Sequence, residues 1–192
     1  WDQPDPLGAD PTKALLHETG QDALVLLFIT LGVTPVRRLF KVNRIQRVRR
    51  MLGVWSFVYA FQHVTIFLVF DRLCYSWETC RLNEIGQDLV NRPFIIMGML
   101  AFSILALLAA TSTSGWVRRL KKNWQRLHRL VYVAAIAAII HFIWIQKSDI
   151  SEPLQWSYWL AVLFALRVYF TILKRAAARP TAVCSCELTV WW

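Results

Sequence analysis

The sequence predicts an all-α protein, a polytopic transmembrane helix bundle. Three observations predict this fold. Hydrophobic residues make up 56% of the 192 residues, which is more than a soluble domain needs for its core. Five apolar segments have about the length, roughly 20 residues, that a helix needs to cross the hydrocarbon core of a bilayer. Basic residues gather in the stretches between these segments.

The five segments follow one another with charged connections. We expect spans at Asp22–Leu39, Met51–Phe70, Pro93–Thr113, Leu130–Gln146 and Leu154–Leu173. A run of arginines separates the first two, and the third begins at a proline. The fourth is the shortest, and its flanking Arg129 and Lys147 can lengthen it by reaching toward the interface. The fifth ends just before Lys174, so we assign residues 1–175 to a transmembrane domain and leave 176–192 as an unassigned tail.

The distribution of charge predicts the orientation, because positively charged loops stay in the cytoplasm. Arg and Lys are concentrated between the first and second spans and between the third and fourth, whereas the other side carries nearly all of the acidic residues. Residue 1 is therefore expected outside and the C-terminus inside. Residue 1 is Trp, and we expect one further helix before it, which would give six spans in the full protein.

The formal net charge of +10 does not indicate a nucleic-acid-binding protein. Such proteins place Lys and Arg on a soluble face beside stacking aromatic residues. Here the positive charge accompanies apolar segments of membrane length, so we expect a lipid bilayer as partner and no nucleic acid.

Two histidines lie well inside predicted spans. His63 stands 12 residues past Met51 and His141 stands 12 residues past Arg129, so each lies about 18 Å from the inner end of its helix. The two helices run in the same direction, and their imidazoles can therefore face each other across a cofactor. Two neutral imidazoles are a standard pair of axial ligands for the iron of a haem that transfers electrons.

Small residues accompany both histidines on the same helical faces. The positions three, four and seven residues before them are Ala138, Ala137 and Ala134 in one helix, and Ala60, Tyr59 and Ser56 in the other. Small side chains leave space for a porphyrin, but they also mediate ordinary packing between transmembrane helices. Both interpretations remain open at this point.

The other two histidines are weaker candidates. His128 lies 13 residues before His141, about 20 Å lower, and could bind a second haem near the cytoplasmic side, with Met51 as a conceivable second ligand. It could equally be an interfacial histidine in a basic loop. His17 could approach the outer haem or simply border the first span.

Two other classes of function compete with an electron carrier. A transporter or channel would use His63 and His141 for protons or metal ions. Such proteins more often carry carboxylates within the spans and helices broken by Gly or Pro at mid-membrane, whereas Pro35 and Pro93 lie at predicted span ends. A structural or assembly subunit would tolerate the loss of both histidines.

Four segments together resemble the ferric-reductase-like transmembrane family, and within it the haem-binding subunits of periplasmic methionine-sulfoxide reductase systems. They cover most of residues 7 to 146 and read LGADPTKALLHETGQDALVLLFITLGVTPVRRL, RVRRMLGVWSFVYAFQHVTIFLVFD, NRPFIIMGMLAFSILALLAATST and NWQRLHRLVYVAAIAAIIHFIW. The family's first helix is absent, and the tail AAARPTAVCSCELTVWW matches no family pattern.

The resemblance implies a membrane cytochrome of the bacterial inner membrane, with residue 1 in the periplasm. It implies haem b, one or two per chain, bound by the histidines that match His63, His128 and His141, and an FMN for which no residue pattern gives a place. Electrons would come from a cytoplasmic flavin reductase or from quinol. They would pass to a periplasmic molybdopterin-containing methionine-sulfoxide reductase, so that this chain is an electron-transfer subunit and not the catalytic one.

The cysteines leave two questions open. Cys74 and Cys80 fall in the predicted outer connection, where an oxidising compartment permits a disulfide without requiring one. Cys184 and Cys186 form a lone C-x-C on the inner side, which is too little for a zinc site with four ligands, and we interpret them as free thiols.

Overall fold

The computed structural model describes residues 11–40, 45–71, 91–146 and 150–177, and all of its regular structure in these ranges is helical. The long helices are α1 (Pro11–Phe40), α2 (Ile45–Ile66), α4 (Pro93–Ala110), α7 (Val131–Ile145) and α8 (Ser151–Ala177). A π-helical turn, η1 (Phe67–Asp71), continues α2. Two short helices, α5 (Ser114–Leu120) and α6 (Lys122–Leu127), and the 3₁₀ turn η2 (His128–Leu130) connect α4 to α7.

Five stretches of the described residues are long and apolar enough to cross a membrane, which confirms the predicted all-helical fold with five spans. They are Pro11–Phe40, Val48–Phe70, Pro93–Ala110, Lys122–Ile145 and Ser151–Leu173. The first begins at Pro11 instead of Asp22, because polar residues before Asp22 continue the helix beyond its apolar part. The fourth is not short, because α6 and η2 extend α7 by a helical run from Lys122.

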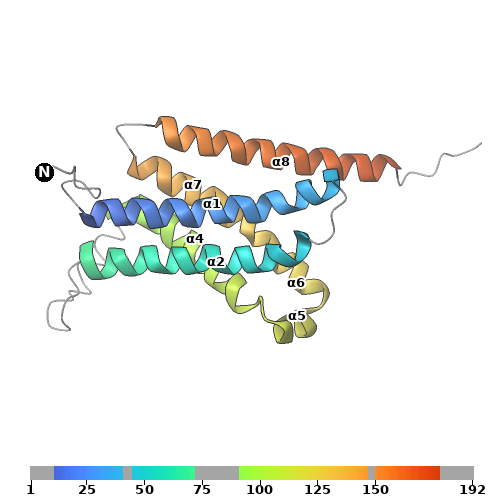
Figure 1. Cartoon of the computed structure of the whole chain (residues 1–192), viewed down its shortest axis with the longest axis horizontal. Coiled ribbons are helices and arrows are strands. Elements are labelled where there is room, and N and C mark those ends of the chain that lie inside the picture. The colour runs from blue at the N-terminus through green and yellow to red at the C-terminus, as the bar shows by residue number, and fades with distance from the viewer. Residues whose placement is uncertain (1–10, 41–44, 72–90, 147–149, 178–192) are drawn as a thin grey trace, which may run out of the picture.

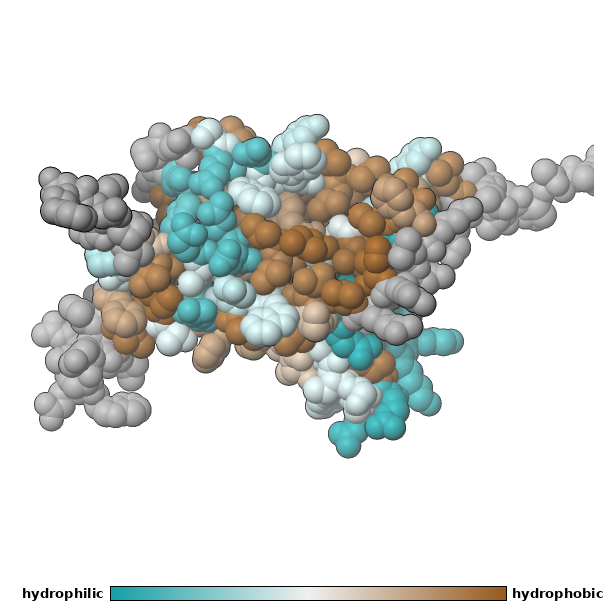
Figure 2. Space-filling model, in the orientation of Figure 1, coloured by the Kyte–Doolittle hydropathy of each residue, from teal (hydrophilic) through white to brown (hydrophobic). Residues whose placement is uncertain are grey.

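The helices form two close pairs with one further helix beside them (Figure 1). α1 packs along α2, α4 packs along α7, and α8 lies against α1 and α7. The shared core is made of side chains from α1, α4, α7 and α8, namely Leu24, Leu27, Phe28, Leu31, Leu105, Leu108, Val131, Ala134, Ala135, Ile139 and Leu160. Many large apolar residues stay exposed on the outside of the bundle, and Figure 2 shows them as a hydrophobic band across its middle. Lipid is the solvent that suits such a surface.

The helices of the bundle alternate in direction, so that some begin and others finish at each end of the bundle. α1, α4 and α8 begin at one end, which we call the outer end after the predicted orientation (Figure 1). The short basic helices α5 and α6 lie at the opposite, inner end, where Figure 2 shows a hydrophilic group of residues. This arrangement agrees with the alternation of spans that the charge pattern predicts.

Candidate haem site

His63 of α2 and His141 of α7 lie side by side in the outer half of the bundle. Their ring centroids are 6.3 Å apart and the ring planes are nearly perpendicular, at 86°. The two residues come from different helix pairs, so only the packing of one pair against the other brings them together. The equal depth that helix rise predicts for them agrees with this arrangement.

One nitrogen of each imidazole is hydrogen-bonded to a backbone carbonyl at the outer end of the neighbouring helix. Nδ1 of His63 lies 2.9 Å from the carbonyl oxygen of Leu16, and Nδ1 of His141 lies 2.6 Å from that of Phe94. A carbonyl oxygen can only accept, so in both rings Nδ1–H is the donor. The hydrogen bond therefore fixes the tautomer and leaves the lone pair on Nε2, the usual arrangement in a metal-binding histidine.

Each imidazole packs against a glycine of the helix that supplies the carbonyl. A Cβ added at Gly20 would lie 3.1 Å from Nδ1 of His63, and one added at Gly98 would lie 2.7 Å from Cε1 of His141. The sequence analysis did not single out these glycines. The signal in the sequence is a glycine inside an otherwise good helical segment. Such a glycine lowers helix stability by about 1 kcal/mol relative to alanine, so its presence indicates a close contact with another part of the chain.

The same arrangement of carbonyl, glycine and histidine occurs twice. In each helix pair the glycine follows the carbonyl residue by one helical turn, at Gly20 after Leu16 and at Gly98 after Phe94. The histidine follows the carbonyl residue by 47 positions in both pairs. No repeat is visible in the sequence, because only the close contact between histidine and neighbouring backbone is repeated. The side chains around the two contacts differ.

These two imidazoles fit a haem iron. A metal binds an imidazole nitrogen at about 2 Å, and that nitrogen lies about 1 Å from its ring centre, so a metal between two imidazoles separates the ring centres by about 6 Å. The observed 6.3 Å matches this separation. Among the described residues no group of three or more His, Cys, Asp or Glu side chains could hold a metal ion alone. A macrocycle that brings its own equatorial nitrogens needs only the two axial ligands.

The small residues near the histidines pack helices together. The Ser56 side chain is fully buried, and its hydroxyl donates a hydrogen bond of 2.9 Å to the carbonyl oxygen of Ala23 in α1. Ala134 is fully buried in the shared core, and Ala137 is 3% exposed. Of the two interpretations left open by the sequence, helix packing accounts for Ser56 and Ala134.

His17 lies apart from the facing pair. Its Nε2 lies 3.6 Å from Oε2 of Glu152 in α8, and its ring meets the edge of Phe142 at 6.2 Å between centroids. The side-chain amide of Gln21 donates a hydrogen bond of 2.9 Å to the same carboxylate. The structure thus places His17 in a polar contact between α1 and α8.

His128 lies at the inner end of α7. Its ring stacks on Trp124 at 3.9 Å between centroids, and its Nδ1 lies 3.2 Å from the Trp124 carbonyl oxygen. Its Nε2 is buried and has no hydrogen-bond partner in the described part of the chain. Met51, the conceivable second ligand, is 56% exposed.

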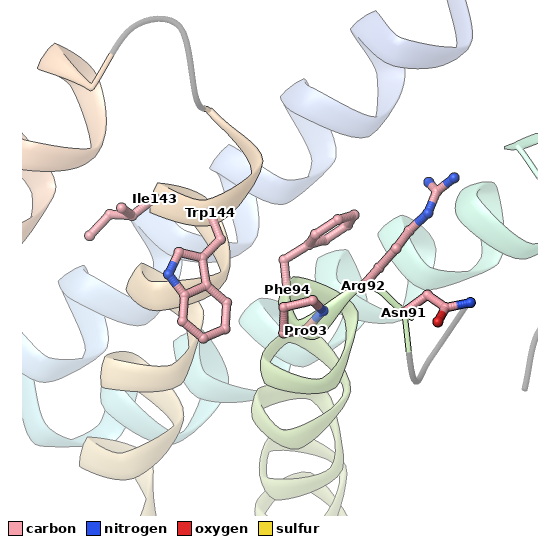
Figure 3. A pocket seen from close by; sticks show the side chains of 6 residues that line it. All are labelled: Asn91, Arg92, Pro93, Phe94, Ile143 and Trp144. Carbon is pink, nitrogen blue, oxygen red and sulfur yellow. The ribbon is translucent and has the colours of Figure 1, made fainter. Parts of the chain in front are cut away.

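A pocket of about 570 Å³ opens at the outer end between α4 and α7, as Figure 3 shows. Phe94, whose carbonyl binds His141, and Trp144 lie on its two sides. Phe94 also lies beside the His141 ring, at 6.3 Å between centroids, so the pocket is next to one of the two histidines. Cys74, Cys80, Cys184 and Cys186 lie outside the described residues.

Comparison with known proteins decides the family. The model of the family described as "Ferric reductase like transmembrane component" matches residues 19–139, a range that contains His63 and His128 and ends just before His141. The "Protein-methionine-sulfoxide reductase heme-binding subunit MsrQ" of Xanthomonas campestris pv. campestris is 46% identical over 177 residues, which are 92% of this chain and 77% of that protein. The chain belongs to the MsrQ branch of the ferric-reductase-like transmembrane family.

Other members of the MsrQ branch are similarly close. The MsrQ protein of Herminiimonas arsenicoxydans is 44% identical over 175 residues, covering 90% of this chain and 78% of its own. That of Xanthomonas oryzae pv. oryzae is 43% identical over 177 residues. No solved structure matches the chain. The family assignment confirms the resemblance drawn from the four sequence segments.

Proposed function

We propose that this chain is the b-type cytochrome subunit of a methionine-sulfoxide reductase system and passes electrons across the membrane. The observation that carries the proposal is the facing pair His63 and His141, each with Nδ1 held by a carbonyl and Nε2 left for iron. The printed names of its MsrQ relatives, heme-binding subunits of such systems, support the assignment of the cofactor.

The residues of the chain perform the binding and positioning. His63 and His141 would hold the haem iron through Nε2, and the carbonyls of Leu16 and Phe94 hold their rings in place. A bound haem supplies one-electron exchange. The apolar bundle around the site excludes water. An iron held by both histidines would be suited to electron transfer and not to oxygen binding.

The direction of transfer follows from the predicted orientation and the family. We propose that electrons enter on the cytoplasmic side from a flavin reductase or from quinol, and leave toward a periplasmic molybdopterin-containing methionine-sulfoxide reductase. In this scheme the chain lies in a bacterial inner membrane with residue 1 periplasmic. FMN is a further cofactor of the scheme, by family resemblance.

His128 is the candidate ligand of a second haem in the inner half. Its support is a buried Nε2 without a hydrogen-bond partner among the described residues, since an orphaned polar nitrogen is costly unless a ligand completes it. A second haem would shorten each electron step between the two faces of the membrane. His17, which contacts Glu152, is the weakest of the four candidates.

The test is the reduced-minus-oxidised visible spectrum of the purified chain, with haem quantified as the pyridine haemochrome. We expect a low-spin b-type spectrum that is lost from the outer site in both His63→Ala and His141→Ala. His17→Ala is the matched control and should keep the spectrum.

A folded chain that takes up no haem when haem is supplied would refute the cytochrome assignment. The transporter alternative, with His63 and His141 on a proton or metal path, would then come first.

A further inference from the structure

Arg167 is a positive charge inside a membrane span. It lies in α8, ten residues before the end of that helix at Ala177, and its side chain is largely covered by α1 and α7. An arginine at this depth costs several kcal/mol unless it is paired, and such residues usually have a function. Arg167 was not among the residues that the sequence predicted to be functional.

Part of the Arg167 side chain repairs a defect in α1. Pro35 lies inside α1 and has no N–H, so the carbonyl of Leu31, four residues earlier, lacks its helical partner. Nη2 of Arg167 donates a hydrogen bond of 2.6 Å to that carbonyl. This hydrogen bond uses one of the five N–H groups of the guanidinium. A neutral side chain with an N–H group could donate the same hydrogen bond, so the contact does not account for the positive charge.

The charge of Arg167 has no acidic partner among the described residues near it. The acidic residues of the described helices, Glu18, Asp22, Asp71 and Glu152, belong to their outer ends. Glu152 precedes Arg167 by 15 residues, about 22 Å of helix. Arg49 and Arg38, which act electrostatically on Arg167, are also positive. Among the described residues of the inner half, no carboxylate balances the half-buried charge of Arg167.

Unsatisfied polar atoms surround the same place. Nε of Arg167 and Oγ1 of Thr34 are buried without hydrogen-bond partners in the described part of the chain. Thr34 lies one turn from the Leu31 carbonyl that Arg167 contacts, and Arg167 stands over the Tyr132 ring at 4.8 Å. Tyr132 is one turn from His128, whose Nε2 is the third buried side-chain atom without a partner there.

We propose that Arg167 and Thr34 form the anion subsite of a redox cofactor bound in the inner half of the bundle. The ligand chemistry is an anionic oxygen group, either the carboxylate of a haem propionate or the phosphate of a flavin nucleotide. The guanidinium supplies the charge and Nε–H, and the threonine hydroxyl supplies a second donor. The proposal rests on the proposed function, because it requires that the chain binds a redox cofactor.

The test compares Arg167→Gln with Arg167→Lys in the full chain, purified after supply of haem and FMN. Haem content, haem potentials in a redox titration, and the flavin released on denaturation are measured separately. We expect Arg167→Gln to weaken binding of one of the two cofactors by about tenfold, as loss of a supporting charged contact does, and Arg167→Lys to retain most of it. Loss confined to flavin assigns the anion to its phosphate.

Loss or change confined to haem assigns the anion to a propionate. In that case the remaining inner haem should also become harder to reduce, because a nearby positive charge favours the electron-rich state. At a fixed potential its reduced-to-oxidised ratio should fall by about tenfold.

A double variant separates the anion subsite from the repair of α1. Pro35→Ala restores the N–H that the Leu31 carbonyl lacks, so Pro35→Ala/Arg167→Gln needs no arginine for the helix. We expect the double variant to stay deficient in cofactor. Full recovery would show that Arg167 only serves the Leu31 carbonyl and would overturn the proposal, as would unchanged haem and flavin in a folded Arg167→Gln variant.

The outcome for the wild-type chain separates this proposal from the proposed function. Wild-type protein that binds flavin but no haem contradicts the cytochrome assignment and leaves the flavin arm of the test in force. Wild-type protein that binds neither contradicts both.

Discussion

At the scale of single residues, the candidate site depends on two glycines, at positions where any larger residue would contact a histidine ring. Gly20 and Gly98 let the imidazoles of His63 and His141 approach the backbone of the neighbouring helix. Without that approach, neither Nδ1 could reach its carbonyl, and neither ring would be held in one tautomer and one orientation. The glycines are thus positioning residues that act through the histidines.

Gly98→Ala should displace His141. The new Cβ would lie 2.7 Å from Cε1 and 2.8 Å from Nδ1 of that ring, closer than real Cβ contacts, and the ring cannot keep its place. We expect loss of the low-spin spectrum of the outer haem and of the haem bound at that site. Haem titration of the purified variant, followed in the visible spectrum, measures both.

Gly32→Ala is the control for this prediction, because an added Cβ there meets nothing within 4 Å. It should keep the spectrum and gain up to about 1 kcal/mol of helix stability. Gly20→Ala, with its closest contact at 3.1 Å, should fall between the two. An unchanged spectrum in Gly98→Ala would show that the glycine does not position His141.

At the scale of the elements, the α1–α2 pair depends on close approach at Ser56. This side chain is fully buried, and its hydroxyl donates a hydrogen bond to the carbonyl of Ala23 in α1. Ala23 lies one helical turn from Thr19, whose hydroxyl oxygen is 3.5 Å from Nδ1 of His63. In lipid, where apolar surfaces gain little from meeting each other, such small polar contacts hold helices together. The pair in turn sets the distance from His63 to its carbonyl.

Ser56→Leu should separate α1 from α2. The larger side chain has no space, and overpacking of this kind costs about 1–3 kcal/mol. Ser56→Ala should lose only the hydrogen bond, about 0.6–1 kcal/mol. Thermal unfolding of the detergent-solubilised protein, followed by circular dichroism, ranks the variants.

Ser103→Ala is the matched control, since Ser103 is exposed and bonds only to Met99 of its own helix. Its melting temperature should equal that of the wild type. Equal melting temperatures for Ser56→Leu and Ser103→Ala would mean that the close contact at Ser56 does not hold the pair.

At the scale of the whole molecule, the two halves of the bundle differ in charge. The facing histidines and the acidic residue Glu152 lie in the outer half, whereas Arg38, Arg49 and Arg167 are in the inner half. Positive charge on the inner side favours an anionic cofactor there and the orientation with that end in the cytoplasm. Both consequences come from one distribution of arginines.

The orientation can be measured directly. Green fluorescent protein fused after the C-terminal residue should fluoresce, and alkaline phosphatase fused at the same place should be inactive, because the first folds in the cytoplasm and the second only outside it. The reverse pattern would place the facing histidines near the cytoplasmic side. It would also reverse the proposed direction of electron flow.

The sequence alone determined the helical class, the five spans found among the described residues and the equal depth of His63 and His141. These follow from segment length, charge position and helix rise, which are local properties of the chain. It could not determine where α1 begins, because polar residues continue a helix when neighbouring helices satisfy them, as the Gln21 amide bonds to Glu152 in α8.

Only the tertiary structure decided which groups meet. It pairs each histidine with a glycine and a carbonyl 43 and 47 positions away in the chain, sends His17 to Glu152, and places Arg167 on the carbonyl that Pro35 leaves free. Periodicity gives the face and the height of a residue on its own helix. It does not give the neighbour across the interface, because that depends on how close two backbones come, which small residues allow and only packing fixes.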